Sequence, residues 1–226
     1  MTDIRAHNRK IRCVIYDCDG VLFDSLESNR RLYEYLCRAM DRPLLSEAEL
    51  MYVHSHTRNE AIHFLFGRDD DLESNVLNLV DQVDLRKYIE YLRMEPHVLE
   101  TMTALKDRGI IRAICTSRTT GMKHIMDQFK LWPYFEMVVT AMDVEHPKPH
   151  PESVDKILQR FYLRKEEAVY VGDSEVDRQT ARASGIQFVA YKNRDMRNEI
   201  IIENHLDLLA LISHPRTNHA RTNKPG

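Results

Sequence analysis

Five short apolar runs, separated by stretches with helical periodicity, constrain the fold of this 226-residue chain more than any other feature. Each run is rich in branched or other apolar side chains, as expected of a strand that is buried on both faces of a sheet. Alternation of such strands with amphipathic helices predicts an α/β fold with a parallel sheet. The runs are Ile11–Tyr16, Ile110–Cys115, Met137–Thr140, Ala168–Val171 and Gln187–Ala190.

Four amphipathic helices are predicted between successive runs. Two of these helices stop at Gly109 and Gly185, since glycine commonly ends a helix. The predicted helices are Val98–Arg108, Thr119–Lys130, Pro151–Phe161 and Glu175–Ser184.

Residues 25–94 differ from the rest of the chain, because they contain no run typical of a strand. Apolar residues keep helical spacing within residues 32–40, 76–83 and 85–92. Thr57 and Glu60 form the T-x-x-E pattern of a capping box before a further helical stretch. Most loops are far shorter. We therefore expect residues 25–94 to be a helical cap domain inserted into a core domain made of residues 1–24 and 95–213.

Composition and charge exclude several classes of protein. Hydrophobic residues make up 43% of the chain and charged residues 30%, which is typical of a globular protein with a sizeable core. The net charge of −3 argues against a nucleic-acid binder, and no apolar run approaches the roughly 18 residues that span a membrane. The N-terminal residues lack an apolar signal region and the four cysteines form no C-x-x-C pair, so a cytoplasmic location is expected. Residues 214–226 are polar and are expected to form a disordered tail, with a functional basic arm as the alternative.

The spacing of the glycines excludes three common sites. It fits neither the dinucleotide-binding fingerprint, nor the P-loop, nor the nucleophile elbow of serine hydrolases. The H-E-x-x-H pattern of zinc proteases is missing as well. If the protein is an enzyme, its chemistry is carried by other residues.

Acidic residues follow two of the predicted strands. Asp17 and Asp19, in the run D-C-D-G, follow the first strand, and strand alternation would point both to the same side. Carboxylates so close repel each other and require a cation or a shared proton. Asp173 and Asp177 follow the fourth strand, one helical turn apart, and such oxygen ligands favour Mg²⁺. The alternatives are solvated aspartates in a surface loop for the first pair and an interaction with the helix dipole for the second.

Hydroxyl groups and a lysine follow the other strands. Thr116 and Ser117 precede a predicted helix, where they are either ordinary caps or phosphate ligands at the helix N-terminus. Lys148 lies among three prolines in H-P-K-P-H-P, which either hold its ammonium in place or leave it solvated in a turn. Ligands of open α/β sheets bind beyond the carboxyl ends of the strands, so these side chains and the acids are expected to meet in one crevice.

Together, these motifs resemble those of the haloacid dehalogenase-like hydrolase superfamily, from Ile11 to about Asn193. D-C-D-G-V-L-F-D-S resembles its first motif, Thr116-Ser117 its second, Lys148 its third and G-D-S-E-V-D its fourth. The resemblance implies a Rossmann-like core with a parallel sheet. It also implies a helical insert similar to the small cap of the phosphoglycolate phosphatase and β-phosphoglucomutase branch.

The resemblance implies catalytic roles for three residues. Asp17 would be the nucleophile that takes the phosphoryl group, and Lys148 would steady Asp17 and the phosphate. Asp19 would be the general acid and base, and its backbone carbonyl would also bind Mg²⁺. These roles suit phosphoryl transfer, which needs charge neutralisation and in-line placement more than strong bases.

The resemblance assigns the other motif residues to phosphate and metal binding. Thr116 would bind phosphate, with Ser117 beside it. Asp173 would ligate Mg²⁺ together with the two acids of the first motif, and Asp177 would support the metal shell.

The sequence departs from the family pattern at three positions. Ser117 stands where asparagine is common, and His97 and His146 replace glycines that are frequent near the cap hinge and the lysine loop. Arg58 opens a predicted cap helix, and an arginine in a similar stretch meets substrate in the β-phosphoglucomutase branch. A solvated arginine paired with a nearby acid is the alternative interpretation of Arg58.

The leading expectation is a Mg²⁺-dependent phosphatase that acts on a small phosphorylated metabolite through an aspartyl phosphate, without a nucleic-acid or membrane partner. One alternative is a hexose-phosphate mutase like β-phosphoglucomutase, which would return the phosphoryl group to a bisphosphate intermediate. Another is a phosphate-binding regulatory protein without turnover. Asp19 argues against haloacid dehalogenation, since a halide leaving group needs no proton. No feature of the sequence indicates an oligomeric state.

Overall fold

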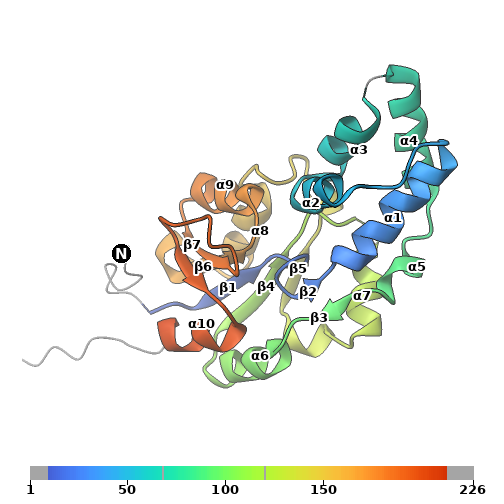
Figure 1. The fold of residues 1–226 in the computed structure, drawn as a ribbon. Helices are drawn as coiled ribbons and strands as arrows, with labels where there is room; N and C mark the ends of the chain where they lie inside the picture. Colours follow the sequence, from blue (N-terminus) through green and yellow to red (C-terminus); the bar gives the residue numbers. More distant parts are fainter. Residues whose placement is uncertain (1–9, 68, 120, 213–226) are drawn as a thin grey trace, which may run out of the picture.

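A parallel β-sheet forms the centre of the computed structural model, which describes residues 10–67, 69–119 and 121–212. The six strands of this sheet are β1 (Cys13–Tyr16), β4 (Ile111–Cys115), β5 (Met137–Val139), β6 (Ala168–Gly172), β7 (Gln187–Tyr191) and β8 (Ile200–Ile202). They lie in the order β5-β4-β1-β6-β7-β8, and every neighbouring pair is parallel. The prediction of a parallel α/β sheet is confirmed (Figure 1).

Helices cover both faces of the sheet. They are α6 (Val98–Asp107), α7 (Gly121–Gln128), α8 (Glu152–Arg160), α9 (Glu175–Ser184) and α10 (His205–Ile212), with short 3₁₀ turns at Trp132–Tyr134, Ala141–Asp143 and Lys165–Glu167. Side chains of a strand alternate between its two faces. Val14 and Tyr16 of β1 therefore join one hydrophobic cluster with α6, α7 and α10. Cys13 and Ile15 join a second cluster with α8 and α9.

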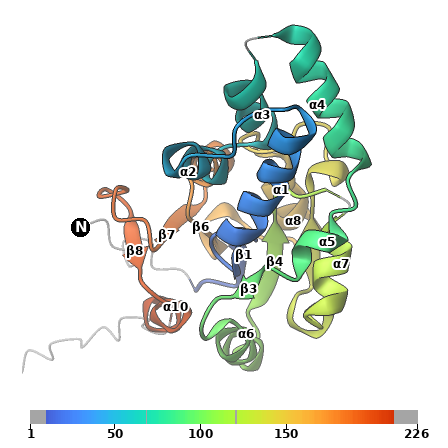
Figure 2. The same cartoon turned by 45° about the vertical axis from the view of Figure 1, so that its right-hand side comes forward.

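Four helices between β1 and β4 form a group of their own: α1 (Leu26–Ala39), α2 (Glu47–Ser55), α3 (Arg58–Phe66) and α4 (Asp70–Gln82). They bury a separate hydrophobic cluster, which includes Leu36, Ile62 and Val76. The predicted capping box is confirmed, since Thr57 Oγ1 accepts the backbone N–H of Glu60 and Glu60 Oε2 accepts that of Thr57. Figure 2 shows these helices grouped beside the sheet.

Three short strands are additional to the five predicted. β8 consists of three isoleucines at the edge of the sheet, a run too short to stand out in the sequence. β2 (Phe23–Asp24) and β3 (Arg93–Met94) pair antiparallel where the chain enters and leaves the group of four helices. The prediction that residues 25–94 hold no strand is therefore wrong at their C-terminal end.

The helical stretch predicted over residues 85–92 is shorter in the structure, where α5 covers only Arg86–Ile89. Ile89 and Leu92 pack into the hydrophobic cluster of the sheet and not into that of the four helices. Because these side chains turn back towards the sheet, the chain leaves the helix and enters β3.

The predicted tail, residues 214–226, lies outside the described residues. Within the part of the chain that the structure describes, no helix is long and apolar enough to cross a membrane.

His205 at the start of α10 makes the stability of the fold depend on pH. Its ring is fully buried, stacks on Tyr191, and donates from Nε2 to the Val21 carbonyl at 2.9 Å. Nδ1 has no hydrogen-bond partner among the described residues. Burial lowers the pKa of His205 to about 4. Since an unfolded histidine titrates near 6.5, the unfolded chain binds more protons between these values, and stability falls as the pH drops through this window.

We expect His205 to cost the fold about 2–3 kcal/mol of unfolding free energy between pH 7 and pH 4.5. Urea unfolding of the protein and of His205→Gln, which keeps an N–H donor but does not titrate, measures this contribution. The variant should lose less stability than the parent over this range. An equal loss would show that His205 titrates normally.

Candidate active site

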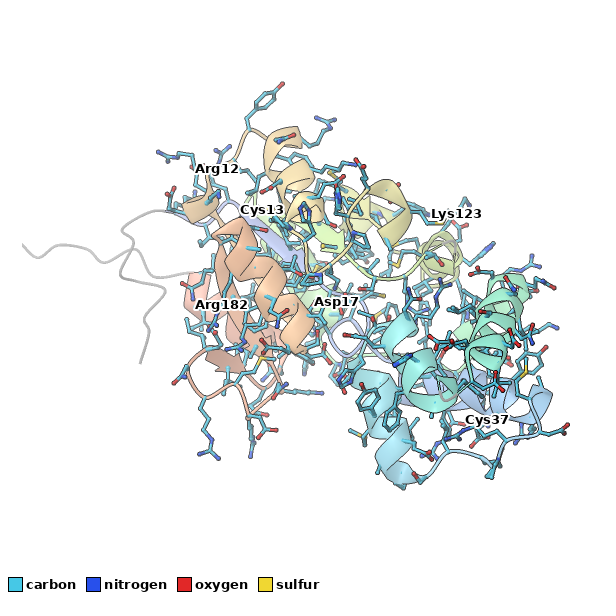
Figure 3. The ribbon with its side chains drawn as sticks, turned by 90° about the horizontal axis from the view of Figure 1, so that it is seen from above. Arg12, Cys13, Asp17, Cys37, Lys123 and Arg182 are labelled. Carbon is cyan, nitrogen blue, oxygen red and sulfur yellow. The ribbon has the colours of Figure 1, made fainter. Side chains whose placement is uncertain are left out.

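The candidate site lies at the carboxyl ends of β4, β1 and β6. The order of the strands reverses at β1, and open α/β sheets bind their ligands at such a point. Asp17 directly follows β1, and its backbone N–H donates to the Val171 carbonyl at 2.9 Å, so the sheet fixes its position. Seen from above, Asp17 lies between the helices of the sheet and the four inserted helices (Figure 3).

Lys148 is a buried cation at the centre of this site. Its Nζ donates to Asp17 Oδ1 at 2.9 Å, to Asp177 Oδ1 at 2.7 Å and to the Tyr170 hydroxyl at 3.2 Å. An ammonium has three N–H donors, so these contacts use all of them. Burial alone would lower the pKa of Lys148, but the charges of Asp17 and Asp177 raise it well above its usual value. The structure therefore places Lys148 as a charged residue beside Asp17 and not as a solvated residue of a turn.

Asp177 orients this network. Its Oδ1 accepts from Lys148 and from the Tyr170 hydroxyl at 3.0 Å. Its Oδ2 accepts the Ser174 hydroxyl at 2.7 Å and the backbone N–H groups of Asp173 and Ser174. Because its lone pairs are already used, Asp177 is suited to supporting a metal ligand and poorly suited to being one.

Asp17 and Asp173 suit a hard divalent cation. Carboxylate oxygens of Asp17, Asp173 and Asp177 lie within 4.8 Å of one another. Burial and the charge of Asp177 raise the pKa of Asp17 to about 7 and that of Asp173 well above its usual value. Gly20 has a φ of 70°, and a Cβ at this position would overlap the Asp173 carboxylate. The glycine therefore leaves room for Asp173 beside Asp17. Excess negative charge and carboxylate ligands together fit Mg²⁺.

Asp19 is held by a different cation. Nε and Nη2 of Arg118 donate to its two carboxylate oxygens, each at 2.6 Å, in a bidentate pair. Burial would raise the pKa of Asp19, but the charge and hydrogen bonds of Arg118 lower it below its usual value. In this conformation Asp19 is a carboxylate without a proton to donate.

Thr116 and Ser117 follow β4 and differ in exposure. Thr116 is buried, and its Oγ1 accepts the backbone N–H of Arg118 at 3.1 Å, which closes a turn. Ser117 is exposed. Both precede α7, as predicted, at the same edge of the sheet as Asp17.

Arg58 lies in the inserted helices, where its Nη1 pairs with Asp81 Oδ1 at 2.7 Å. Both side chains are exposed, which matches the alternative interpretation of Arg58. Tyr33 of α1 and His54 of α2 are both influenced by the charge of Asp19. Burial raises the pKa of Tyr33, with the charge of Arg58 opposing this shift and that of Asp19 adding to it. Burial lowers the pKa of His54, and the charge of Asp19 opposes that shift.

Sequence analysis does not single out three further residues of the site: Arg118, Tyr170 and Asn193. The Tyr170 hydroxyl also lies 3.0 Å from the Cys115 carbonyl, and Asn193 Nδ2 donates to the Asp173 carbonyl at 2.7 Å. A polar hydroxyl in the otherwise apolar strand A-V-Y-V-G is the one sequence signal that could reveal Tyr170. Arg118 directly follows the second motif, and its pairing with Asp19 has no sequence signal.

The fold and the strand-end acids and lysine are those of a parallel α/β enzyme of the haloacid dehalogenase type. The family model for haloacid dehalogenase-like hydrolases matches residues 14–191. The chain therefore belongs to this family of hydrolases.

Individual relatives agree with this assignment. The pyrophosphatase PpaX of Bacillus cereus is 30% identical over 179 residues, which cover 74% of this chain and 77% of the relative. The phosphoglycolate phosphatase of Escherichia coli O157:H7 is 26% identical over 198 residues, which cover 77% and 79% of the two chains. A solved structure of a haloacid dehalogenase-superfamily hydrolase from Geobacter sulfurreducens is 36% identical, with a TM-score of 0.73 and coverage of 89% of this chain and 96% of that one.

Proposed function

We propose that this protein is a Mg²⁺-dependent phosphatase that hydrolyses a small phosphate monoester through an aspartyl phosphate on Asp17. The observation that carries the proposal is the contact of Asp17 Oδ1 with the buried Lys148 ammonium, 2.9 Å away, beside the acid cluster with Asp173. A carboxylate nucleophile and a phosphate repel each other, and positive charge at this place offsets the repulsion. The relatives named as phosphoglycolate phosphatase and pyrophosphatase support the same class of reaction.

The reaction would proceed in two steps. Asp17 attacks phosphorus, and its bond to phosphorus forms as the bond to the leaving oxygen breaks. Asp19, once its pair with Arg118 has opened and it has taken a proton from solvent, gives that proton to the leaving oxygen. It then takes a proton from the water that hydrolyses the aspartyl phosphate. Thr116, with Ser117 beside it, would bind the phosphate oxygens, and Lys148 would steady them together with Asp17.

Mg²⁺ would be held by Asp17, Asp173 and the backbone carbonyl of Asp19, while Asp177 keeps Asp173 and Lys148 in position. When bound, the ion supplies positive charge next to the phosphate.

Phosphate release from a panel of phosphorylated metabolites, with Mg²⁺ and with EDTA, tests this proposal. Activity should require Mg²⁺ and should be lost in Asp173→Asn, which removes one anionic ligand and keeps the shape of the side chain. Asp195→Asn, an exposed aspartate outside the cluster, is the matched control and should leave activity unchanged. Full turnover by Asp173→Asn or by the EDTA-treated enzyme would contradict the metal role. An isomerised sugar phosphate without phosphate release would point to a mutase.

We further propose that the substrate carries a second anionic group. Asp19 acts as an acid only when its bidentate pair with Arg118 opens. A second anion on the leaving group would take the guanidinium in exchange and release Asp19. Phosphoglycolate and pyrophosphate, after which the relatives are named, both carry such a group.

Arg118→Met should therefore lower kcat/KM for phosphoglycolate and pyrophosphate by roughly tenfold to a hundredfold more than for p-nitrophenyl phosphate, since a charged hydrogen bond to the substrate is lost. Steady-state kinetics with the three substrates measure this difference. Arg58→Ala separates the two interpretations of that residue. Equal effects on the three substrates fit the exposed pair with Asp81, whereas a larger rise in KM for phosphoglycolate would show that Arg58 contacts the leaving group. Equal losses of kcat/KM for all three substrates in Arg118→Met would show that Arg118 holds Asp19 and does not bind the substrate.

We propose that residues 25–94 are a cap domain over the core formed by residues 1–24 and 95–213, with the β2–β3 pair as the joint. Tyr33 and His54 support this: burial is the main cause of the pKa shift of each, and the charge of Asp19 acts on both pKa values. A cytoplasmic location suits the four cysteines, which are buried free thiols.

A further inference from the structure

A second cluster of potential metal ligands lies on the loop that carries Lys148. His146 and His150 are exposed, and Glu152 is the first residue of α8. Ligand atoms of these three residues all lie within 4.8 Å of one another. The two imidazole rings are 4.7 Å apart, and His146 Nδ1 is 3.4 Å from Glu152 Oε2. Three side chains thus converge without any contact to the acids around Asp17.

The loop fixes the two histidines by its backbone. The N–H of His150 donates to the Pro147 carbonyl at 3.1 Å, which forms a turn. Pro149 and Pro151 flank His150, and Pro147 follows His146; each proline restricts its own φ and so stiffens the loop. Lys148 lies inside this turn and sends its ammonium inward to Asp17, while both histidines stay on the solvent side. The backbone N–H of Glu152 donates to His150 Nδ1 at 3.3 Å, which orients that ring and leaves its Nε2 free to bind an ion.

The carboxylate of Glu152 is held in place before any ion binds. Oε1 accepts the backbone N–H of Glu145 at 3.0 Å, and Oε2 accepts that of His146 at 2.9 Å. These hydrogen bonds lower the pKa of Glu152 to about 2. Oε1 also pairs with Lys156 Nζ at 3.3 Å, so its lone pairs are used. Oε2, which faces His146, keeps a further lone pair, so it is the ionised and oriented ligand atom of this side chain.

The donor set selects the ion. Two imidazoles and one carboxylate are a ligand set of Zn²⁺, whereas Mg²⁺ prefers oxygen ligands alone. We propose that His146, His150 and Glu152 form a Zn²⁺ site, separate from the acid cluster of Asp17 and Asp173, that braces the loop of Lys148. Three protein ligands leave a fourth position of the ion for water or an external ligand.

Other exposed histidines provide an internal comparison. His97 lies 2.9 Å from Glu100, and His63 lies 3.0 Å from Glu73. Each of these pairs has a single imidazole, so neither offers the three convergent ligands of the proposed site. His97→Ala is therefore a matched control that removes an exposed histidine paired with a glutamate.

Isothermal titration of the full chain with Zn²⁺, in millimolar Mg²⁺ to occupy the acid cluster, tests the proposal without using activity. The parent should bind one Zn²⁺. The affinity for this ion should fall by about 100-fold or more in His146→Ala and in His150→Ala, because losing a ligand costs more than the roughly 10–100-fold lost with a supporting residue. Glu152→Gln should weaken binding as well, and His97→Ala should not. Unfolding temperatures in EDTA confirm that the variants fold. Unchanged binding in both histidine variants, or no binding by the folded parent, would overturn the proposal.

Discussion

Replacing Asp17 by asparagine is expected to abolish turnover of every phosphate ester, whereas Asp19→Asn is expected to complete the first step with an activated substrate and then stall as the phosphoenzyme. Asp17→Asn lacks the nucleophile, so no phosphoenzyme forms from any substrate. Asp19→Asn keeps the nucleophile and the Lys148 contact but lacks the proton donor. The nitrophenolate of p-nitrophenyl phosphate leaves without protonation, so the first step proceeds. The water that attacks the aspartyl phosphate then has no base.

Rapid mixing with p-nitrophenyl phosphate measures this difference. Asp19→Asn should give a burst of one nitrophenolate per site, followed by a steady rate about 10²–10⁴-fold below that of the parent, which is the usual worth of general acid–base catalysis. Asp17→Asn should give neither phase. A burst in Asp17→Asn and none in Asp19→Asn would reverse the two roles.

Lys148→Met is expected to impair both catalysis and stability, because it removes the cation that contacts Asp17 and Asp177. Both carboxylates are buried, and breaking a buried ion pair from one side typically costs about 3–5 kcal/mol of unfolding free energy. Loss of one positive group at the phosphate should lower kcat by about 10²–10³-fold. Urea unfolding in EDTA and phosphate release in Mg²⁺ measure the two effects.

Lys123→Met is the matched control for this substitution. Lys123 is 71% exposed and pairs with Asp127 one helical turn away, an interaction worth about 0.5 kcal/mol. The loss of stability in Lys148→Met should also shrink in Mg²⁺, since the ion binds the unpaired acids only in the folded chain. Equal stability of the two variants would show that Lys148 is not a structural ion-pair partner.

Much of the fold could be predicted because local patterns and tertiary structure agree. Strands buried on both faces, such as β6, read as apolar runs, and the capping box of Thr57 and Glu60 forms as its spacing predicts. The prediction is wrong where tertiary packing decides. Leu92 continues a helical pattern, yet it packs against the sheet and the helix ends at Ile89. Three isoleucines form β8 only because β7 offers them an edge.

In the site too, some residues could be predicted from local sequence motifs, whereas others depend on tertiary contacts. Asp17, Lys148, Asp173 and Asp177 could be proposed from motifs that follow strands, since parallel strands bring their carboxyl ends to one edge. The bidentate pair of Arg118 with Asp19 joins residues 99 positions apart and depends on two side-chain conformations. No periodicity or spacing encodes such a contact. The proposed dependence on a second substrate anion could therefore arise only from the structure.

The most direct test of the proposed function is to find the phosphoryl group on the protein. Asp19→Asn is mixed with p-nitrophenyl phosphate and Mg²⁺, quenched in acid within the burst, digested, and analysed by mass spectrometry. We expect one phosphate on the side chain of Asp17, stable in acid and labile in base. This phosphate should be missing when EDTA replaces Mg²⁺ and when Asp17 is also changed to Asn. A phosphate on any other residue, or phosphate release without a phosphorylated Asp17 in this variant, would show that Asp17 is not the nucleophile.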